Sequence, residues 1–143
     1  MARRILVPVD GSSKAQEGLE YALSTYPEEE ITVLHVMTPF ETGDTEDHPL
    51  PQDLAEEWRE QAHEQATDIL DEAHTSANEH GVDISTAIEI GEAWRTIVDY
   101  TTENDIDHII MGSHGRTDNS PLPLGSVAET VMRRSPVLVS IVR

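Results

Sequence analysis

Cysteine is absent from this chain of 143 residues, which excludes disulfide bonds and thiolate metal sites. Basic residues are scarce: nine Lys and Arg, of which Lys14 is the only lysine, stand against 28 Asp and Glu, for a formal net charge of −19. Because binding to nucleic acid or to an anionic membrane needs a cationic surface, we expect neither partner. No apolar run approaches the roughly 20 residues that span a bilayer. No secretory signal pattern is found, so we expect a cytoplasmic protein.

Aromatic residues make up only 4% of the chain and hydrophobic residues 37%. High charge with few aromatics is typical of disordered chains, but regular apolar periodicities predict a folded protein here. A chain of this length forms one domain with its own core, so residues 1–143 are expected to be a single domain. The excess of acid and the near absence of lysine favour a halophilic protein, in which high salt screens the repulsion between carboxylates.

Short apolar segments alternate with segments of helical periodicity. Strands are predicted over residues 4–9, 31–36, 82–90, 107–111 and 136–142, and helices over residues 15–26, 54–77, 94–101 and 125–132. This alternation predicts an α/β fold, a Rossmann-like open parallel sheet of five strands with helices on both faces. No helix carries a set of metal ligands that we expect to converge, so no metal site formed by the chain itself is predicted.

The strand over residues 82–90 alternates apolar and polar side chains, as expected of an edge strand with one wet face. Placing it at the edge gives the strand order 3-2-1-4-5. The final strand, from Pro136 to Val142, is almost continuously apolar, which predicts burial of both faces, inside the sheet or against another subunit. Residues 38–51 are rich in proline and acid and form a loop long enough to cover a site.

A glycine-rich stretch follows the fourth strand and carries the strongest functional signal. The stretch contains Gly112 and Gly115 and, after nine intervening residues, Gly125 and Ser126. Glycine lets a ligand approach the backbone closely, and Gly125-Ser126 begins a helix whose first N–H groups attract anions. A phosphate cradle of backbone amides and the Ser126 hydroxyl needs no lysine. The alternative is that the glycines only form turns and that Ser126 only caps the helix.

Asp10 directly follows the first strand, as the glycine-rich stretch follows the fourth. Open parallel sheets bind ligands beyond the carboxyl ends of their strands, where the strand order reverses. In the order 3-2-1-4-5 this point lies between the first and fourth strands, so Asp10 and Gly112 are expected to flank one crevice. The alternative for Asp10 is a carboxylate that serves only the turn or the cap of the next helix.

Three segments resemble the universal stress protein family. They are Ile-Leu-Val-Pro-Val-Asp-Gly-Ser at residues 5–12, Ile-Ile-Met-Gly-Ser-His-Gly-Arg-Thr at 109–117 and Gly-Ser-Val-Ala-Glu-Thr-Val at 125–131. The glycine spacing is similar to that of the ATP-binding branch of the family. The resemblance implies the sheet of adenine nucleotide alpha hydrolase-like folds, bound ATP, a divalent ion such as Mg²⁺ held mainly by the phosphates, and a homodimer formed through the final strand, residues 136–142.

The resemblance also implies roles for individual residues. Asp10 and Val36 would line the adenine and ribose end of the site. The ribose and α-phosphate would lie along Met111, Gly112 and Gly115, and the outer phosphates at Gly125, Ser126 and Val127. With the neighbours of these positions, the expected site residues are Pro8, Val9, Asp10, Val36, Met111, Gly112, His114, Gly115, Arg116, Gly125, Ser126 and Val127.

The stretch between Gly115 and Gly125 departs from the family pattern, which commonly has another glycine and a basic residue there. In that stretch this chain has Asp118, Pro121 and Pro123, and Arg116 is the only basic residue between Gly115 and Gly125. A carboxylate near a triphosphate weakens its binding, so AMP or ADP, or a stronger dependence of ATP binding on Mg²⁺, becomes the expectation.

Three functions are consistent with these residues. The first is a nucleotide-binding protein of stress response or signalling, in which the nucleotide changes the shape or partners of a dimer. The second is a slow ATP-hydrolysing or nucleotidyl-transfer enzyme that uses the same crevice, for which only His114 and Arg116 are candidates to act on developing charge. The third is a structural dimer with an empty crevice. The sequence favours the first.

Overall fold

The computed structural model describes residues 2–38, 52–114 and 124–143. The expected covering loop, most of the stretch between Gly115 and Gly125, and the site residues Gly115 and Arg116 lie outside the described residues. In chain order the elements are β1 (Arg4–Pro8), α1 (Ser13–Thr25), β2 (Glu30–Met37), α2 (Gln52–Glu79), β3 (Ile84–Ile90), α3 (Ala93–Glu103), β4 (His108–Gly112), α4 (Ser126–Arg134) and β5 (Leu138–Val142).

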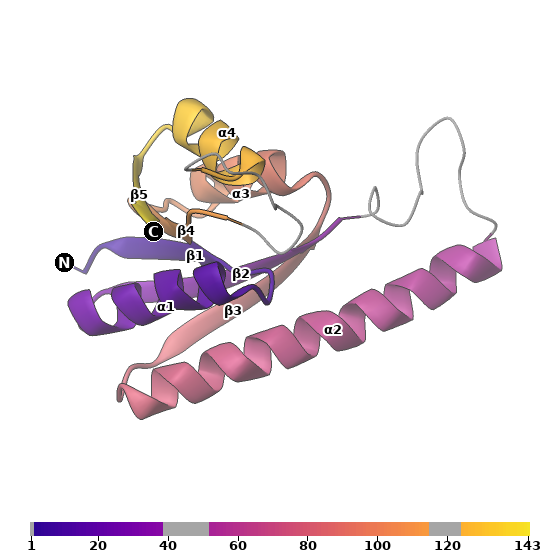
Figure 1. Cartoon of the computed structure of the whole chain (residues 1–143), viewed down its shortest axis with the longest axis horizontal. Helices are drawn as coiled ribbons and strands as arrows, with labels where there is room; N and C mark the ends of the chain where they lie inside the picture. The colour runs from indigo at the N-terminus through magenta and orange to yellow at the C-terminus, as the bar shows by residue number, and fades with distance from the viewer. Residues whose placement is uncertain (1, 39–51, 115–123) are drawn as a thin grey trace.

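The strands form one parallel sheet in the order β3-β2-β1-β4-β5 (Figure 1). The central strand β1 pairs with β2 through Ile5 and Ile31 and with β4 through Ile5 and His108. The α/β fold and the strand order expected from the sequence are therefore confirmed. The carboxyl ends of β1 and β4 lie side by side, as a site between them requires.

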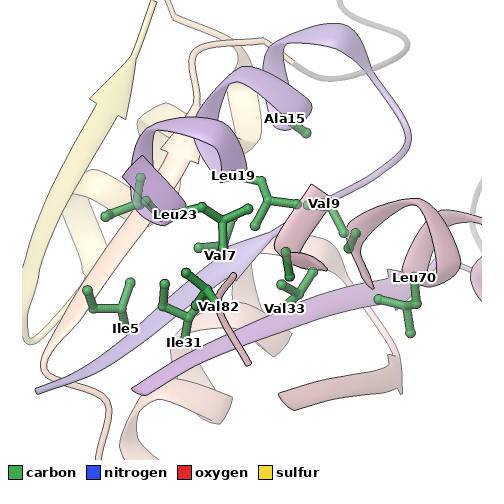
Figure 2. Packing of buried hydrophobic residues seen from close by; sticks show 14 of the residues in the cluster. Ile5, Val7, Val9, Ala15, Leu19, Leu23, Ile31, Val33, Leu70 and Val82 are labelled. Carbon is green, nitrogen blue, oxygen red and sulfur yellow. The ribbon is translucent and has the colours of Figure 1, made fainter. Parts of the chain in front are cut away.

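Helices cover both faces of the sheet. On one face, α1 and α2 pack on β1 and β2 through a cluster that includes Ile5, Val7, Leu19 and Val33, all with no exposed surface (Figure 2). On the other face, α3 and α4 pack through a second cluster around Leu6, which has no exposed surface either. Burial of both faces explains why β1, β2 and β4 are almost continuously apolar rather than alternating.

Two glycines let α1 approach β4 closely. A Cβ atom on Gly112 would lie 2.4 Å from the carbonyl oxygen of Lys14, and one on Gly18 would lie 3.2 Å from the Gly112 nitrogen. The backbones of α1 and β4 therefore touch at this point. Gly112 is required by the packing of a helix on the sheet, in addition to any role toward a ligand.

Both edges of the sheet are open to solvent in the single chain. β3 is an edge strand, as its alternation predicts. β5 is the other edge; Leu138 is 61% exposed and the remaining residues of the strand are half-buried. Of the two alternatives for the final strand, burial inside the sheet is wrong, because the strand order places β5 outermost. Burial against another subunit remains a prediction.

Candidate functional site

A cavity opens at the carboxyl ends of β1, β2 and β4 and is closed on its other side by α3 and α4. The space within it that is open to water-sized molecules is about 150 Å³. Every expected site residue that the structure describes lines it: Pro8, Val9, Asp10, Val36, Met111, Gly112, His114, Gly125, Ser126 and Val127. The sequence did not single out the other lining residues, which are Ala15, Leu34, Thr38, Ala93, Ile97 and Ala128.

Asp10 is held by the turn between β1 and α1. Its Oδ1 accepts a hydrogen bond of 2.9 Å from the Ser12 N–H, and the Ser12 hydroxyl caps α1 by accepting from the Ala15 N–H at 3.1 Å. Gly11 between them has a φ of 85°, which glycine adopts without strain. Asp10 therefore serves the turn, as the alternative interpretation held, and also lines the cavity.

His35 supports this wall from behind. Its Nδ1 lies 2.8 Å from the carbonyl oxygen of Val9, and the side chain is buried. Because a carbonyl only accepts, Nδ1 carries the proton and donates to Val9. The backbone at Val9 also donates from its N–H to the Leu34 carbonyl at 2.9 Å. These two bonds fix the end of β1 at the position where Asp10 begins.

The first turn of α4 supplies the polar end of the cavity. Gly125 is the N-cap, and its carbonyl accepts the first hydrogen bond of the helix, from the Glu129 N–H at 3.0 Å. Ser126 is thus the first helical residue and not the cap, so the interpretation of Ser126 as a mere capping serine is wrong. The N–H groups of Ser126, Val127 and Ala128 precede the first intrahelical bond and point from the helix end that attracts anions.

The N–H of Gly125 is engaged within the protein. It donates to the Ser113 carbonyl at 2.5 Å, and the Ser113 N–H donates in turn to the Val142 carbonyl of β5 at 2.9 Å. The Gly125 N–H, which the predicted phosphate cradle included, is therefore not available to a ligand. Among the described residues at this end of α4, the backbone amides that remain for an anion are those of Ser126, Val127 and Ala128, and the exposed Ser126 side chain adds a hydroxyl.

The two ends of the cavity differ in chemistry. Leu34, Val36 and Ile97 make an apolar wall between β2 and α3, whereas His114, Ser126 and the α4 amides lie at the other end. Among the lining residues that the structure describes there is no lysine or arginine. Attraction of an anion by these residues depends on the helix terminus and on hydrogen bonds.

Metal ligands are few in this cavity. No group of three or more His, Asp or Glu side chains that could hold an ion occurs within residues 2–38, 52–114 and 124–143. The side-chain oxygen and nitrogen atoms that the described lining offers to a metal ion are those of the Asp10 carboxylate, the His114 ring and the hydroxyls of Thr38 and Ser126. These few ligands fit a metal ion that is coordinated mainly by a bound ligand. They do not fit an ion coordinated by protein side chains alone.

The model of the universal stress protein family matches residues 1–143. The chain belongs to the universal stress protein family. Universal stress protein YxiE of Bacillus subtilis is 30% identical over 151 residues that cover 100% of both chains. Universal stress protein MJ0577 of Methanocaldococcus jannaschii is 29% identical over 153 residues, covering 97% of this chain and 94% of the relative.

Solved structures of universal stress proteins share the fold. That of MJ0577 superimposes with a TM-score of 0.83 at 29% identity, covering 99% of this chain and 96% of that chain. Universal stress protein UspA from Lactobacillus plantarum gives 0.84 at 24% identity, covering 99% and 97% of the two chains. More distant family members have been solved with cAMP (24% identity, TM-score 0.71), with AMP (Arabidopsis thaliana; 15%, 0.68) and with dAMP (Archaeoglobus fulgidus; 18%, 0.68).

In the part of the chain that the structure describes, no helix has the length and apolar character needed to cross a bilayer.

Proposed function

We propose that this universal stress protein binds an adenine nucleotide in the cavity at the ends of β1 and β4, and that the nucleotide regulates a homodimer in stress response. The observation that carries the proposal is the division of one cavity into an apolar wall and a helix terminus. A flat aromatic base fits the first and a phosphate the second. The family complexes with cAMP, AMP and dAMP support the same class of ligand.

The phosphate end favours a ligand of modest charge. The chain carries a net charge of −19, and the described lining offers amides and a hydroxyl but no lysine or arginine. Each further phosphate adds negative charge to an already negative surrounding, which opposes binding. We therefore expect AMP to bind at least as tightly as ATP without Mg²⁺, and Mg²⁺ to strengthen the binding of ATP selectively.

Calorimetric titration of the full chain with AMP, ADP and ATP, each with Mg²⁺ and with EDTA, tests the proposal. Saturable binding of adenine nucleotides, with no binding of the matched guanine nucleotides, is the expected result. A turnover assay on the same samples separates binding from catalysis, since repeated release of phosphate or pyrophosphate would identify an enzyme instead. Heat signals that stay at the level of dilution for all the adenine nucleotides would overturn the proposal.

Asp10→Asn provides the variant matched to this experiment. The amide oxygen of asparagine can still accept from the Ser12 N–H, so the turn and the melting temperature should be preserved. The negative charge in the cavity is lost. If Asp10 accepts hydrogen bonds from the ribose or adenine, all three nucleotides should bind about tenfold more weakly. Unchanged affinity would leave Asp10 with its turn role alone.

The dimer is expected to form through the open edge of β5. Unpaired backbone groups on an edge strand pair readily with another strand. Leu138 of β5 is 61% exposed, and Met132 of the adjoining helix α4 is 45% exposed. Sedimentation velocity should show a dimer that Leu138→Asp converts to monomer. Tyr21→Asp, which adds the same charge at an exposed position of α1, is the control and should remain dimeric. A dimer unaffected by Leu138→Asp would contradict this interface.

A further inference from the structure

The amino-terminal part of α2 extends beyond the sheet (Figure 1). Among the described residues of this 28-residue helix, Ala66 is the first that is buried, and from there the helix packs through Ile69, Leu70 and Ala73. The preceding turns carry large apolar side chains as well. Leu54 is 47% exposed and Trp58 is half-buried.

These apolar side chains lie on one side of the helix. Leu54, Trp58 and Ala62 follow at intervals of four residues, which places them on successive turns along one line. A half-buried tryptophan one turn from an exposed leucine is typical of a surface that meets another molecule. Tryptophan in particular is enriched among the residues that dominate binding energies.

A line of carboxylates borders the apolar line. Glu57, Glu64 and Asp68 are exposed and follow at spacings of seven and four residues, so they share one side of the helix, and Glu57 neighbours Leu54 at a spacing of three. In residues 54–79 the only lysine or arginine is Arg59. We use the name α2 arm for the surface made by Leu54, Trp58, Ala62, Glu57, Glu64 and Asp68.

We propose that the α2 arm docks a cationic amphipathic segment of a partner protein. Apolar side chains of such a segment would cover Leu54 and Trp58, and its lysines or arginines would face the carboxylates beside them. Charge complementarity decides against the other occupants. A second copy of the arm would oppose one line of carboxylates to another, and an anionic membrane surface would be repelled.

The arm is separate from the nucleotide cavity. No residue of α2 is among the described residues that line the cavity, whose walls come from the other elements. The docking proposal therefore stands whether or not a nucleotide binds, and both sites can be tested on one sample.

Trp58 gives a direct probe of the arm. The chain contains two tryptophans, and Trp94→Phe leaves Trp58 as the only one while keeping an aromatic ring in the contact with Arg134. We would titrate this full-length variant with a tryptophan-free amphipathic peptide of leucine and lysine. The expected result is a saturable blue shift of the Trp58 emission, with an affinity that falls as KCl is added.

Three comparisons make the result specific. Leu54→Glu should weaken the peptide by about tenfold or more, whereas Tyr21→Glu, at an exposed position of α1 that is 42% accessible, should not. Combined Glu57→Gln, Glu64→Gln and Asp68→Asn should weaken the salt dependence, because the local carboxylates are lost while the rest of the negative charge of the chain remains. A peptide with glutamate in place of lysine should not bind.

Several outcomes would overturn the docking proposal. They are a Trp58 emission that the lysine peptide does not move, equal responses to the lysine and glutamate peptides, and equal losses in the Leu54 and Tyr21 variants. A blue shift that depends on protein concentration without any peptide would instead assign the arm to self-association.

Discussion

Gly112 serves the packing of α1 on β4 as well as the cavity, and the two roles have different consequences for mutation. An added Cβ would meet the Lys14 carbonyl at 2.4 Å and the Ala15 nitrogen at 2.9 Å, and both are backbone atoms that cannot turn aside. The sequence could show that a glycine follows a buried strand. It could not show that a helix backbone lies against that glycine, because the contact joins residues far apart in the chain.

We predict that Gly112→Ala destabilises the protein by about 1–3 kcal/mol, the usual cost of overpacking. Chemical denaturation with and without nucleotide measures it. Gly81→Ala is the comparison variant, because nothing lies within 4 Å of its new Cβ. Its φ of 67° is unfavourable for alanine, so we expect a loss of about 1–2 kcal/mol in the free energy of unfolding from backbone strain alone. A Gly112→Ala variant as stable as the wild type would contradict the close contact.

His108 is a buried histidine at the start of β4, 2% exposed, with its Nε2 2.8 Å from the Ser140 hydroxyl. Burial, and secondarily the positive charge of Arg3, lower the pKa of His108. In the unfolded chain a histidine titrates near about 6.5. Below that pH the unfolded state binds a proton that folded His108 does not, so the folded state becomes relatively less favourable.

We therefore predict that the contribution of His108 lowers the free energy of unfolding as the pH falls below about 6.5. Urea titrations across this range measure the dependence. His108→Gln, which keeps a group able to bond with Ser140, should show a flatter dependence than the wild type. Parallel curves for the two proteins would show that His108 does not contribute.

His35 illustrates a supporting position behind the cavity that the sequence did not single out. It occupies an ordinary place in an apolar strand, and its importance comes from one bond to the Val9 carbonyl on the neighbouring strand. The only available signal was the buried polar residue itself in the run Ile-Thr-Val-Leu-His-Val, since a buried ring nitrogen needs a partner. Asp10 was predicted as a site residue because it directly follows a strand, and Val36 because the family resemblance implies it; both line the cavity.

At the scale of the element, α4 is where prediction from sequence and structure differ most informatively. Gly125-Ser126 correctly marked the start of a helix, but the assignment of cap and first residue depends on the local backbone. Gly125 has φ −71° and ψ 161°, an extended conformation, and Ser126 is already helical. A shift of one residue in the start of a helix changes which N–H groups are available to a ligand, and sequence patterns do not locate helix starts that finely.

Two substitutions at Ser126 separate the contributions of the hydroxyl and the amide. Ser126→Ala removes only the hydroxyl, whereas Ser126→Pro removes the hydroxyl and the N–H. Proline is favoured at the first helical position, and the extended backbone of Gly125 is compatible with a following proline. We expect both variants to fold and AMP to bind progressively more weakly, by about 3- to 10-fold at each step.

Calorimetry with AMP and with adenosine measures this series. Adenosine, which has no phosphate, is the control ligand and should bind all three proteins equally. If adenosine loses affinity in parallel with AMP, Ser126 does not lie at the phosphate end.

At the scale of the whole molecule, the fold could be predicted almost completely. Continuous apolar strands, one alternating strand and four intervening helices determine a parallel sheet and its edge. The position of β5 followed from the strand order, but its apolar character suggested burial that the single chain does not provide. A continuously apolar strand can be buried within its own chain or by a partner chain, and the sequence alone does not distinguish these two kinds of burial.

The excess of carboxylates leads to a prediction about salt. With a net charge of −19, repulsion between like charges opposes the compact state at low ionic strength. We expect the melting temperature to rise steeply between low salt and molar KCl, where the Debye length falls to about 3 Å. Scanning calorimetry in KCl, with sucrose as an uncharged stabiliser for comparison, measures it. A melting temperature that KCl leaves unchanged would show that charge repulsion is unimportant here.

The bond from the Gly125 N–H to the Ser113 carbonyl has a practical consequence for engineering. It holds Ser113, where the chain leaves β4, next to Gly125, where the chain enters α4. Whatever sequence is inserted between those points starts and finishes at fixed positions, one of them anchored to β5 through Val142. We therefore expect that replacing residues 115–123 with the corresponding stretch of another family member leaves β4, α4 and β5 folded as they are.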